Sequence, residues 1–296
     1  MSETRVGLVV VDKPAGWTSH DVVARTRRLA GTRKVGHAGT LDPMATGVLL
    51  LGVGRATRLL GHLQLADKEY LATMRLGRTT VTDDAEGDLV ERTDASGVTD
   101  DAVRAAVLPL TGDIEQVPTA VSAIKVDGRR SYARVRAGED VQLPARPVTV
   151  STFEVTDVRH LQVDGLAVVD VDARVVCSSG TYVRALARDL GAALGVGGHL
   201  TMLRRTRVGG FDLDVASTLE ELERSWQHVA LDDAARAAFP SLDLDEAAAG
   251  EVRFGRALAD VDLGAPGPVA LFAPDGRFLA LYEQRGGSAR AVAVFV

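Results

Sequence analysis

The chain has few of the residues from which cross-links, metal sites and stacking platforms are built. Its 296 residues include one cysteine, Cys177, which excludes an intrachain disulfide and a cysteine-based zinc site. This cysteine follows an apolar stretch, and we interpret it as a small buried hydrophobe. Aromatic residues make up 4% of the chain, which argues against RNA recognition through many stacked bases.

Long apolar runs are also absent. No window approaches the roughly 20 apolar residues of a membrane-spanning helix, and the N-terminal residues do not resemble a signal sequence. With 46% hydrophobic residues, the chain can bury a sizeable core and is long enough for one large domain and a small one. The composition therefore predicts a soluble, cytoplasmic protein without membrane association.

The patterns that hold metals, dinucleotides or a catalytic serine are missing as well. Gly52-Val53-Gly54 follows an expected strand, but the third position of a dinucleotide fingerprint is Thr57, and no Gly-x-Ser-x-Gly run occurs. The histidines lack the i, i+4 spacing of a metalloprotease helix. They are His20, His37, His62, His160, His199 and His228. We therefore expect neither a metal nor a cofactor.

The net charge of −6 has the wrong sign for binding RNA, but its distribution matters more than its sum. Residues 210–296 carry 15 acidic and 7 basic side chains, so residues 1–209 have a net charge of +2. The basic residues of this first part form three clusters that could follow an RNA backbone, although each could also be a solvated face. The clusters are Arg25, Arg27, Arg28, Arg33 and Lys34; Lys125, Arg129, Arg130, Arg134 and Arg136; and Arg204, Arg205 and Arg207.

Hydrophobic periodicity predicts an α+β fold, because strands and helices alternate without regular βαβ repeats. One helix is expected to be capped by Ser19 or Asp21 and to end at Gly31. The other expected helices cover 57–63, 100–108 and 182–194. Expected strands cover 7–11, 48–53, 70–76, 148–158, 166–176 and 201–209, with 148–158 and 166–176 joined as an antiparallel hairpin near Asp164.

Near residue 238, an acidic and alanine-rich stretch gives way to short strand candidates. We therefore expect two domains, 1–238 and 239–296. After this point, strand candidates at 252–258, 269–272, 278–282 and 291–296 are separated by Gly, Pro and Asp. This pattern indicates a small β domain. A domain of this size is marginal alone, so we expect it to pack on the larger one.

One run, Gly36-His37-Ala38-Gly39-Thr40-Leu41-Asp42-Pro43-Met44-Ala45-Thr46-Gly47, combines three glycines and a proline with a single carboxylate. Such a backbone can turn tightly and let a ligand approach closely. An Asp-Pro pair is also a common turn opener, so an ordinary connecting loop is the alternative. If the run is a site, its chemistry begins with Asp42, the only residue in it that is normally charged.

This run resembles the catalytic loop of the TruB family of tRNA pseudouridine synthases, and every fixed position of the family's Gly-His-x-Gly-x-Leu-Asp-Pro-x-Ala-x-Gly pattern matches. The resemblance, of a bacterial and actinobacterial-like kind, extends in the family's order over roughly residues 5–210. The matching runs are 11–14 with Gly16, 68–70, 112–118, 178–184 and 203–205. It implies the pseudouridine synthase fold, with a mixed or antiparallel central sheet and flanking helices, and a C-terminal PUA or PUA-like domain.

The resemblance also implies a reaction. Uridine becomes pseudouridine when the C1′–N1 bond breaks, the captive uracil rotates and C1′ joins C5, which requires no cofactor. Asp42 corresponds to the catalytic carboxylate, and Arg184 to its arginine partner, because a carboxylate in a dry pocket stays ionised beside a cation. Whether Asp42 attacks C1′ or the base, or removes the ribose 2′ proton, is open at this point.

Five further residues match family positions. Tyr70 corresponds to the tyrosine that stacks on the target base and can exchange a proton, Tyr182 to a pocket residue, and Leu203 to the apolar residue that closes the pocket. His37 matches the histidine that fills the place vacated by the flipped base. Lys13 belongs to the N-terminal motif, where its role is substrate binding or support. Tyr70, Tyr182 and Leu203 would also suit an ordinary core.

The sequence departs from some relatives at one position, where Ser179 replaces a lysine and puts one phosphate contact in doubt. Residues 125–141 compare with the family's RNA-gripping insertion, with Tyr132 in the expected place. The resulting hypothesis is a tRNA pseudouridine-55 synthase that binds the T-arm of tRNA as a monomer with no obligatory protein partner. Two alternatives are an RNA-folding chaperone and an enzyme that modifies an H/ACA-guided RNA.

Overall fold

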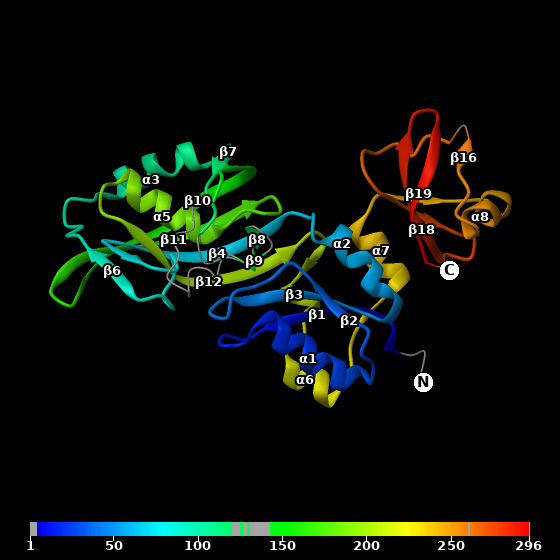
Figure 1. The fold of residues 1–296 in the computed structure, drawn as a ribbon, viewed down its shortest axis with the longest axis horizontal. Helices are drawn as coiled ribbons and strands as arrows, with labels where there is room; N and C mark the ends of the chain where they lie inside the picture. The colour runs from blue at the N-terminus through cyan, green and yellow to red at the C-terminus, as the bar shows by residue number, and fades with distance from the viewer. Residues whose placement is uncertain (1–4, 120–124, 127–128, 131–142, 260, 296) are drawn as a thin grey trace.

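The computed structural model describes residues 5–119, 125–126, 129–130, 143–259 and 261–295, and two sheets dominate it (Figure 1). The larger sheet has ten strands, and its main path runs β14-β1-β3-β12-β4-β11-β10-β7, with β2 paired to β3 and β13 paired to β12. The bounds are β1 Gly7–Lys13, β2 Val35–Ala38, β3 Thr46–Val53, β4 Lys68–Leu76, β7 Gly112–Gln116, β10 Arg146–Val163, β11 Leu166–Cys177, β12 Gly198–Val208, β13 Phe211–Asp212 and β14 Val229–Ala230.

Neighbouring strands in this sheet are antiparallel except for β3 and β12, which run parallel where Thr46 and Gly47 face Arg204 and Arg205. The alternation of apolar and polar residues in β10 and β11 produces the expected hairpin, which turns at Asp164 and Gly165. The mixed sheet and its helices confirm the predicted α+β fold.

Four helices bury their apolar sides against one face of the large sheet, in a single hydrophobic cluster. They are α1 (Ser19–Ala30), α3 (Asp100–Ala106), α5 (Val183–Ala193) and α6 (Leu219–Arg224). Figure 1 shows α1 beside α6 along one half of the sheet, and α3 near α5 along the other half. The buried residues of β4 that belong to this cluster are Tyr70, Ala72, Met74 and Leu76. The polar residues Glu69, Thr73 and Arg75 alternate with them and so lie on the opposite face of the sheet.

Helix α1 ends at Gly31 as expected, in the left-handed conformation, but its cap was predicted wrongly. The N-cap is Thr18, whose hydroxyl accepts a hydrogen bond from the Asp21 amide, while the Asp21 carboxylate accepts one from the Thr18 amide. Ser19 is buried and has a different partner, because its hydroxyl and the Leu41 backbone exchange hydrogen bonds of 2.9 and 3.1 Å.

The C-terminal part forms the second sheet, in the order β15-β17-β18-β19-β16. Its elements are β15 Ser241–Asp243, α8 Glu246–Arg253, β16 Leu258–Ala259, β17 Val269–Phe272, β18 Phe278–Arg285 and β19 Ser288–Val294. The strand expected at 252–258 was wrong. The first two residues of that range end helix α8, which Asp245 caps and whose buried side includes Ala249 and Val252. A turn and a short loop follow at 254–257, and β16 begins only at Leu258.

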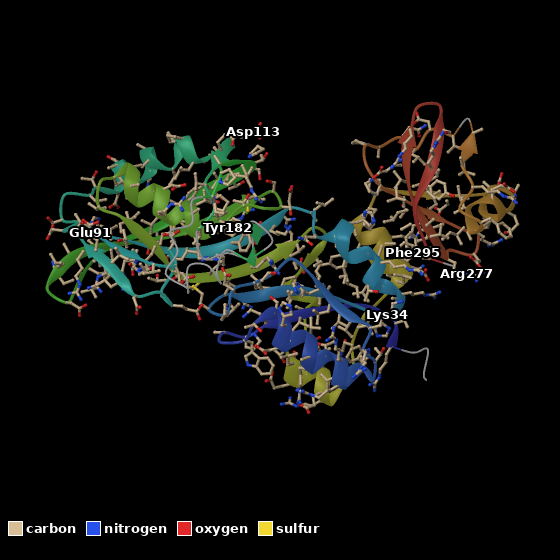
Figure 2. All side chains as sticks on the ribbon, viewed as in Figure 1. Lys34, Glu91, Asp113, Tyr182, Arg277 and Phe295 are labelled. Atoms are coloured by element: carbon tan, nitrogen blue, oxygen red, sulfur yellow. The ribbon has the colours of Figure 1, made fainter. Side chains whose placement is uncertain are left out.

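Apolar residues from both sheets form one shared cluster between them, which includes Leu50 of β3 and Phe272 of β17. The elements packed here are η2 (Gly54–Leu59), α2 (Leu60–Leu63) and α7 (Leu231–Ala238). Figure 2 shows Phe295 at this junction, and the Arg58 guanidinium donates a 2.8 Å hydrogen bond to the Val294 carbonyl. The small domain therefore packs on the large one, as expected.

The remaining elements are short: β5 Arg78–Thr80, β6 Leu89–Arg92, β8 Lys125–Val126, β9 Arg129–Arg130, η3 Leu108–Leu110 and η4 Leu213–Val215. Within the described residues, no helix is both long enough and apolar enough to cross a membrane.

Candidate active site

Asp42 lies in the loop between β2 and β3, and the loop is held from both sides of that residue. Before Asp42, the buried Ser19 hydroxyl bonds the Leu41 backbone. After it, the Pro43 carbonyl accepts the Gly16 amide at 2.8 Å and the Lys13 Nζ at 3.2 Å. The backbone around the carboxylate is therefore fixed by the N-terminal motif and the start of α1, as a preorganised site requires.

Lys13 is fully buried beneath this loop, and its ammonium contacts three backbone carbonyls. Nζ donates to Pro14 at 2.9 Å, to Trp17 at 2.7 Å and to Pro43 at 3.2 Å. Burial lowers the pKa of Lys13 to about 8, against the opposing attraction of Asp42. These contacts suit a supporting role, and its assignment as a substrate-binding residue stays a prediction.

Two glycines of the run have positive φ, Gly39 at 80° and Gly47 at 99°. A Cβ on Gly47 would lie 2.1 Å from the Arg205 backbone carbonyl. Glycine is therefore required where β3 meets β12, and this close approach brings the side chains of β12 under the Asp42 loop.

The Arg184 guanidinium lies against the Asp42 carboxylate. Nε is 3.0 Å from Oδ2, and Nη2 donates to Oδ1 at 3.3 Å. Arg184 stands in the first turn of α5, where the Gln116 side chain accepts the Tyr182 amide and donates to the Tyr182 carbonyl. The two residues come from segments 142 positions apart, and the fork geometry fits a carboxylate with two charge-assisted contacts.

A second carboxylate, Asp84, lies on the same guanidinium, with Oδ2 3.5 Å from Nε of Arg184. The Thr82 carbonyl accepts Nη1 of Arg184 at 2.8 Å, and Oδ1 of Asp84 accepts the Glu86 amide at 3.0 Å. The exposed fractions of the two carboxylate side chains differ, 35% for Asp42 and 4% for Asp84. Only Asp42 can therefore meet a substrate.

Asp84 was not predicted as a site residue, although it stands in an acidic run that follows β5. The preceding residue, Asp83, has a φ of 57°, which is uncommon outside glycine. Its carboxylate accepts the Thr119 hydroxyl at 2.9 Å and an Arg188 guanidinium contact at 3.4 Å. Burial raises the pKa of Asp83. Thr119 and Arg188 of α5 therefore hold this turn, which carries the neighbouring Asp84 to Arg184.

Tyr70 and Leu203 lie on the neighbouring strands β4 and β12, each 7% exposed, in the cluster that also contains Leu41. Burial raises the pKa of the Tyr70 hydroxyl, and the nearby Arg205 guanidinium opposes this rise. Tyr182 is half-buried at the start of α5 (Figure 2). The structure thus brings residues of three distant runs to one side of the large sheet, and their individual roles stay predictions.

His37 lies on β2, half-buried, with its ring edge to face against His20 at a centroid distance of 5.6 Å. Burial, reinforced by His20, lowers the pKa of His37. A mainly neutral ring can enter a base stack without carrying a charge into it, which suits the role expected of His37. That His37 takes the place of the flipped base in the RNA stack stays a prediction.

The basic side chains of the three predicted clusters differ in their burial and in their partners. Arg205 was wrongly grouped with RNA-facing residues, because it is 1% exposed and its side chain donates to backbone carbonyls. Arg204 pairs with Asp12 at 2.7 Å, and Arg25 pairs with Glu223. The side chains of the second cluster and Tyr132 lie outside the described residues. Among the described side chains of these clusters, the exposed ones lie at the end of α1 and in the loop after it, and they are Arg27, Arg28, Arg33 and Lys34.

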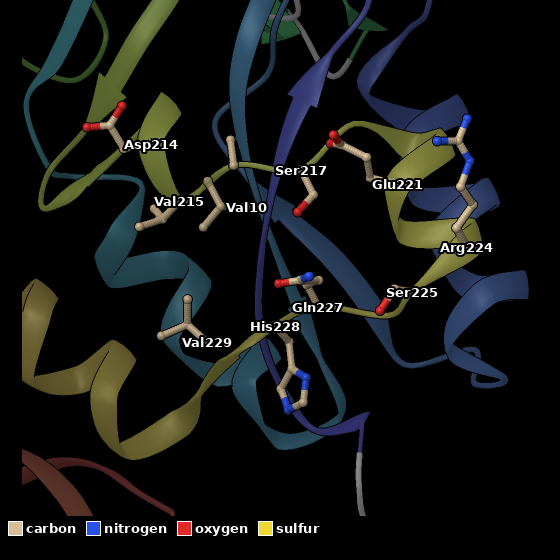
Figure 3. Close-up of a pocket in the computed structure, with 11 residues that line it drawn as sticks. Val10, Asp214, Val215, Ser217, Glu221, Arg224, Ser225, Gln227, His228 and Val229 are labelled. Carbon is tan, nitrogen blue, oxygen red and sulfur yellow. The ribbon is translucent and has the colours of Figure 1, made fainter.

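Within the described part of the chain, no group of three or more His, Cys, Asp or Glu side chains is arranged to hold a metal ion. A cavity of about 550 Å³ lies elsewhere, beside β1, α6 and β14 (Figure 3). Its lining includes Asp214, Glu221 and His228 but none of the residues around Asp42.

Comparison with known proteins gives consistent matches along the whole chain. Residues 27–183 match the model of the TruB family pseudouridylate synthase N-terminal domain. Residues 184–244 match that of the tRNA pseudouridylate synthase B C-terminal domain, and residues 239–296 match the C-terminal model of tRNA pseudouridine synthase II.

Among similar sequences is the tRNA pseudouridine synthase B of Streptomyces griseus, which is 61% identical over 98% of this chain and 97% of the relative. That of Thermobifida fusca is 61% identical over 98% of both chains. Among solved structures, a Cbf5-Nop10-Gar1 complex matches with a TM-score of 0.72 and 27% identity, over 99% of this chain and 85% of the other. An H/ACA RNP bound to a substrate RNA matches with a TM-score of 0.69 and 26% identity, over 99% of this chain and 86% of the other.

Proposed function

The chain belongs to the TruB family of pseudouridine synthases, and from this premise we propose that it isomerises the uridine at position 55 in the T loop of tRNA, with Asp42 as the reacting carboxylate. Its curated relatives are tRNA pseudouridine synthases, which supports tRNA as the substrate and isomerisation as the reaction. Position 55 rests on the likeness of the loop and its flanking motifs to the family.

One observation carries the assignment to Asp42. Two carboxylates contact Nε of Arg184, but the side chain of Asp84 is 4% exposed and that of Asp42 is 35% exposed. Asp84 therefore pairs with the guanidinium out of contact with solvent. Asp42 shares the same cation and keeps an open edge toward solvent, as a group that attacks a nucleotide must.

In this proposal the other residues prepare the nucleotide for Asp42. Extruding a uridine from its stack costs a few kcal/mol, and the His37 ring on β2 offsets part of that cost by taking its place. Tyr70 and Leu203 enclose the uracil on the apolar side, which excludes water while the base rotates. Tyr182, fixed through its backbone by Gln116, borders the same pocket.

The proposed organisation keeps the boundary at residue 238. Residues 1–238 form the pseudouridine synthase domain, and residues 239–296 form a PUA-like domain with its own cluster of buried residues, such as Val252 and Leu271. We propose that the chain acts as a monomer without an obligatory protein partner, because the Asp42, Arg184 and Asp84 side chains all come from one copy. Light scattering of the purified chain, together with its turnover of tRNA, tests this.

The variant Asp42→Asn tests the function, because it removes the charge and nearly preserves the shape. We expect it to bind tRNA within a few-fold of the parent and to release no tritium from tRNA labelled at C5 of uridine. Asp214→Asn, in the distant cavity, is the matched control and should keep full activity. Tritium release by Asp42→Asn would refute the role of Asp42.

The site of modification is tested separately. Pseudouridine maps of total RNA, with and without the enzyme, should differ at position 55 of tRNAs. Changes confined to another RNA would overturn the substrate assignment and favour the guided-target alternative. Full rescue of a deletion strain by Asp42→Asn, with turnover abolished, would favour the chaperone alternative.

A further inference from the structure

Arg205 is the largest of the fully buried side chains, with 1% of its surface exposed. Within the described residues, no carboxylate lies within ion-pair distance of its guanidinium. Burying a cation is costly unless its donors are satisfied, so the contacts that replace a carboxylate indicate what the residue does.

Those contacts are backbone carbonyls around the Asp42 loop. Nε donates to Val48 at 2.7 Å, Nη2 to Gly39 at 3.2 Å and Nη1 to Thr40 at 3.4 Å. Gly39 and Thr40 precede Asp42 by three and two positions, and Val48 follows the loop in β3. One planar group thus holds the backbone on both sides of the loop.

Tyr70 is the cross-strand partner of Arg205, because the two residues are paired across β12 and β4, so their backbones fix the separation of the two side chains. The guanidinium acts on the phenol, since it lowers the pKa of Tyr70 against the burial that raises it. A guanidinium has donors and no acceptor, so the phenol oxygen is the only atom of the hydroxyl that can face it favourably, and the phenol proton is directed elsewhere.

We propose that Arg205 is a positioning residue for the isomerisation, holding the Asp42 loop and the Tyr70 hydroxyl in a fixed relation through one guanidinium. The inference rests on the proposed function for what Asp42 and Tyr70 do to the nucleotide. The link between Arg205 and Tyr70 does not depend on the proposed function, and it can be measured without RNA. Lysine cannot replace this residue, because a single ammonium cannot span Val48, Gly39 and Tyr70.

The first experiment observes Tyr70 in the full chain. Tyrosine carrying carbon-13 at Cζ gives signals from four residues, and Tyr70→Phe identifies the one from Tyr70. We expect Arg205→Lys and Arg205→Met to move this signal, because the guanidinium that acts on the phenol is removed. Arg75→Met is the control, since Arg75 lies on β4 but pairs with Asp170 on the opposite face of the sheet. An unmoved Tyr70 signal in both Arg205 variants would overturn the link.

The second experiment measures turnover of tRNA. We expect Arg205→Lys to lower kcat by about 10- to 100-fold and to change KM by less than about threefold, because positioning acts on the bound state. Arg75→Met should keep both constants. In the Tyr70→Phe background the effect of Arg205→Lys should shrink, which a structural role alone would not produce.

The outcomes separate the two proposals. An unchanged kcat in Arg205→Lys, with the Tyr70 signal moved, would leave the contact real and overturn the positioning role. No turnover by the parent chain would refute the proposed function, while the Tyr70 signal would still decide the link. If Arg205→Met does not fold, Arg205→Lys, which keeps the charge, carries both measurements.

Discussion

Two buried lysines show how the number of acceptors sets the consequence of losing a proton. Burial lowers the pKa of both Lys13 and Lys68 to about 8. Lys68 donates to the Gln64 and Ala66 carbonyls, which the two N–H bonds of a neutral amine can still satisfy. Lys13 has three carbonyl acceptors, so its neutral form turns a lone pair toward one of them.

The sign for stability follows from proton binding. An unfolded lysine titrates near 10.5, so between about pH 8 and pH 10.5 the unfolded chain binds more protons than the folded one. Each lysine therefore makes a contribution to the unfolding free energy that rises with pH across this window. The penalty of burying the charge is present below pH 8 and is relieved above it.

Activity should follow the opposite course at Lys13. The longest of its three contacts holds the Pro43 carbonyl beside Asp42, and deprotonation weakens this hold. We expect kcat to fall above an apparent pKa of about 8, measured as initial rates of tritium release between about pH 7 and pH 9.5. Lys68→Met should keep this alkaline limb. Lys13→Met should have lower activity at every pH and no limb, and a limb that persists in it would assign the titration to another group.

At the scale of the element, the approach of β3 to β12 depends on one residue. A Cβ at Gly47 would meet the Arg205 backbone carbonyl at 2.1 Å, and the φ of 99° is strained for any other residue. We expect Gly47→Ala to lower the unfolding free energy by about 2–4 kcal/mol, from backbone strain and the forced separation of the strands. Urea unfolding measures the loss.

Gly112→Ala is the matched control, because Gly112 has a φ of 95° but nothing within 4 Å of the position of a Cβ. It should cost only the strain, about 1–2 kcal/mol. Equal losses in the two variants would show that the close contact between β3 and β12 adds nothing to the strain. In Gly47→Ala we also expect kcat to fall, because Arg205 belongs to the strand that is displaced.

Elements with a strong local pattern were predictable from the sequence, and those set by partners were not. The alternation in β10 and β11 and the helix beginning near Tyr182 needed no tertiary information. The strand expected at 252–258 was wrong because helix α8, which Asp245 caps, extends to Arg253, and an apolar residue such as Val252 suits either element. The buried contacts of Arg205 were hidden in the same way, because an Arg-Arg pair gives no sign of which side chain faces inward.

The candidate site shows the same difference between residues that lie in recognisable runs and residues whose role depends on distant partners. Asp42 and Arg184 were found through runs that resemble a family, since nothing in either run alone shows that they meet across 142 positions. Asp84 was missed, because its importance comes from facing the buried side of Arg184. Ser19 was assigned to a cap, whereas the backbone of Leu41 is its partner. Each error concerns a long-range polar contact, for which a sequence carries no period.

At the scale of the whole molecule, the two sheets should unfold as one unit, because a shared cluster of buried residues joins them in addition to the cluster that each has of its own. Phe278 lies at its centre, 3% exposed, with ring centroids 5.5 Å from Phe272 and 4.7 Å from Phe295. Its amide donates at 2.9 Å to Asp232 of α7. Removing the ring therefore weakens the contact of the small domain with the large one.

The chain offers a clean probe of this coupling, because both tryptophans, Trp17 and Trp226, pack against the cluster of the large sheet. We expect Phe278→Ala to lower the unfolding free energy by about 3–5 kcal/mol, and to shift the tryptophan fluorescence transition and the far-UV circular dichroism transition together. Phe254→Ala, at a position 78% exposed, should shift neither by more than about 0.5 kcal/mol. If the dichroism of Phe278→Ala is lost in an earlier step while the fluorescence midpoint stays at the parent value, the domains are independent. The shared cluster would then contribute to docking of the small domain and not to the stability of the large one.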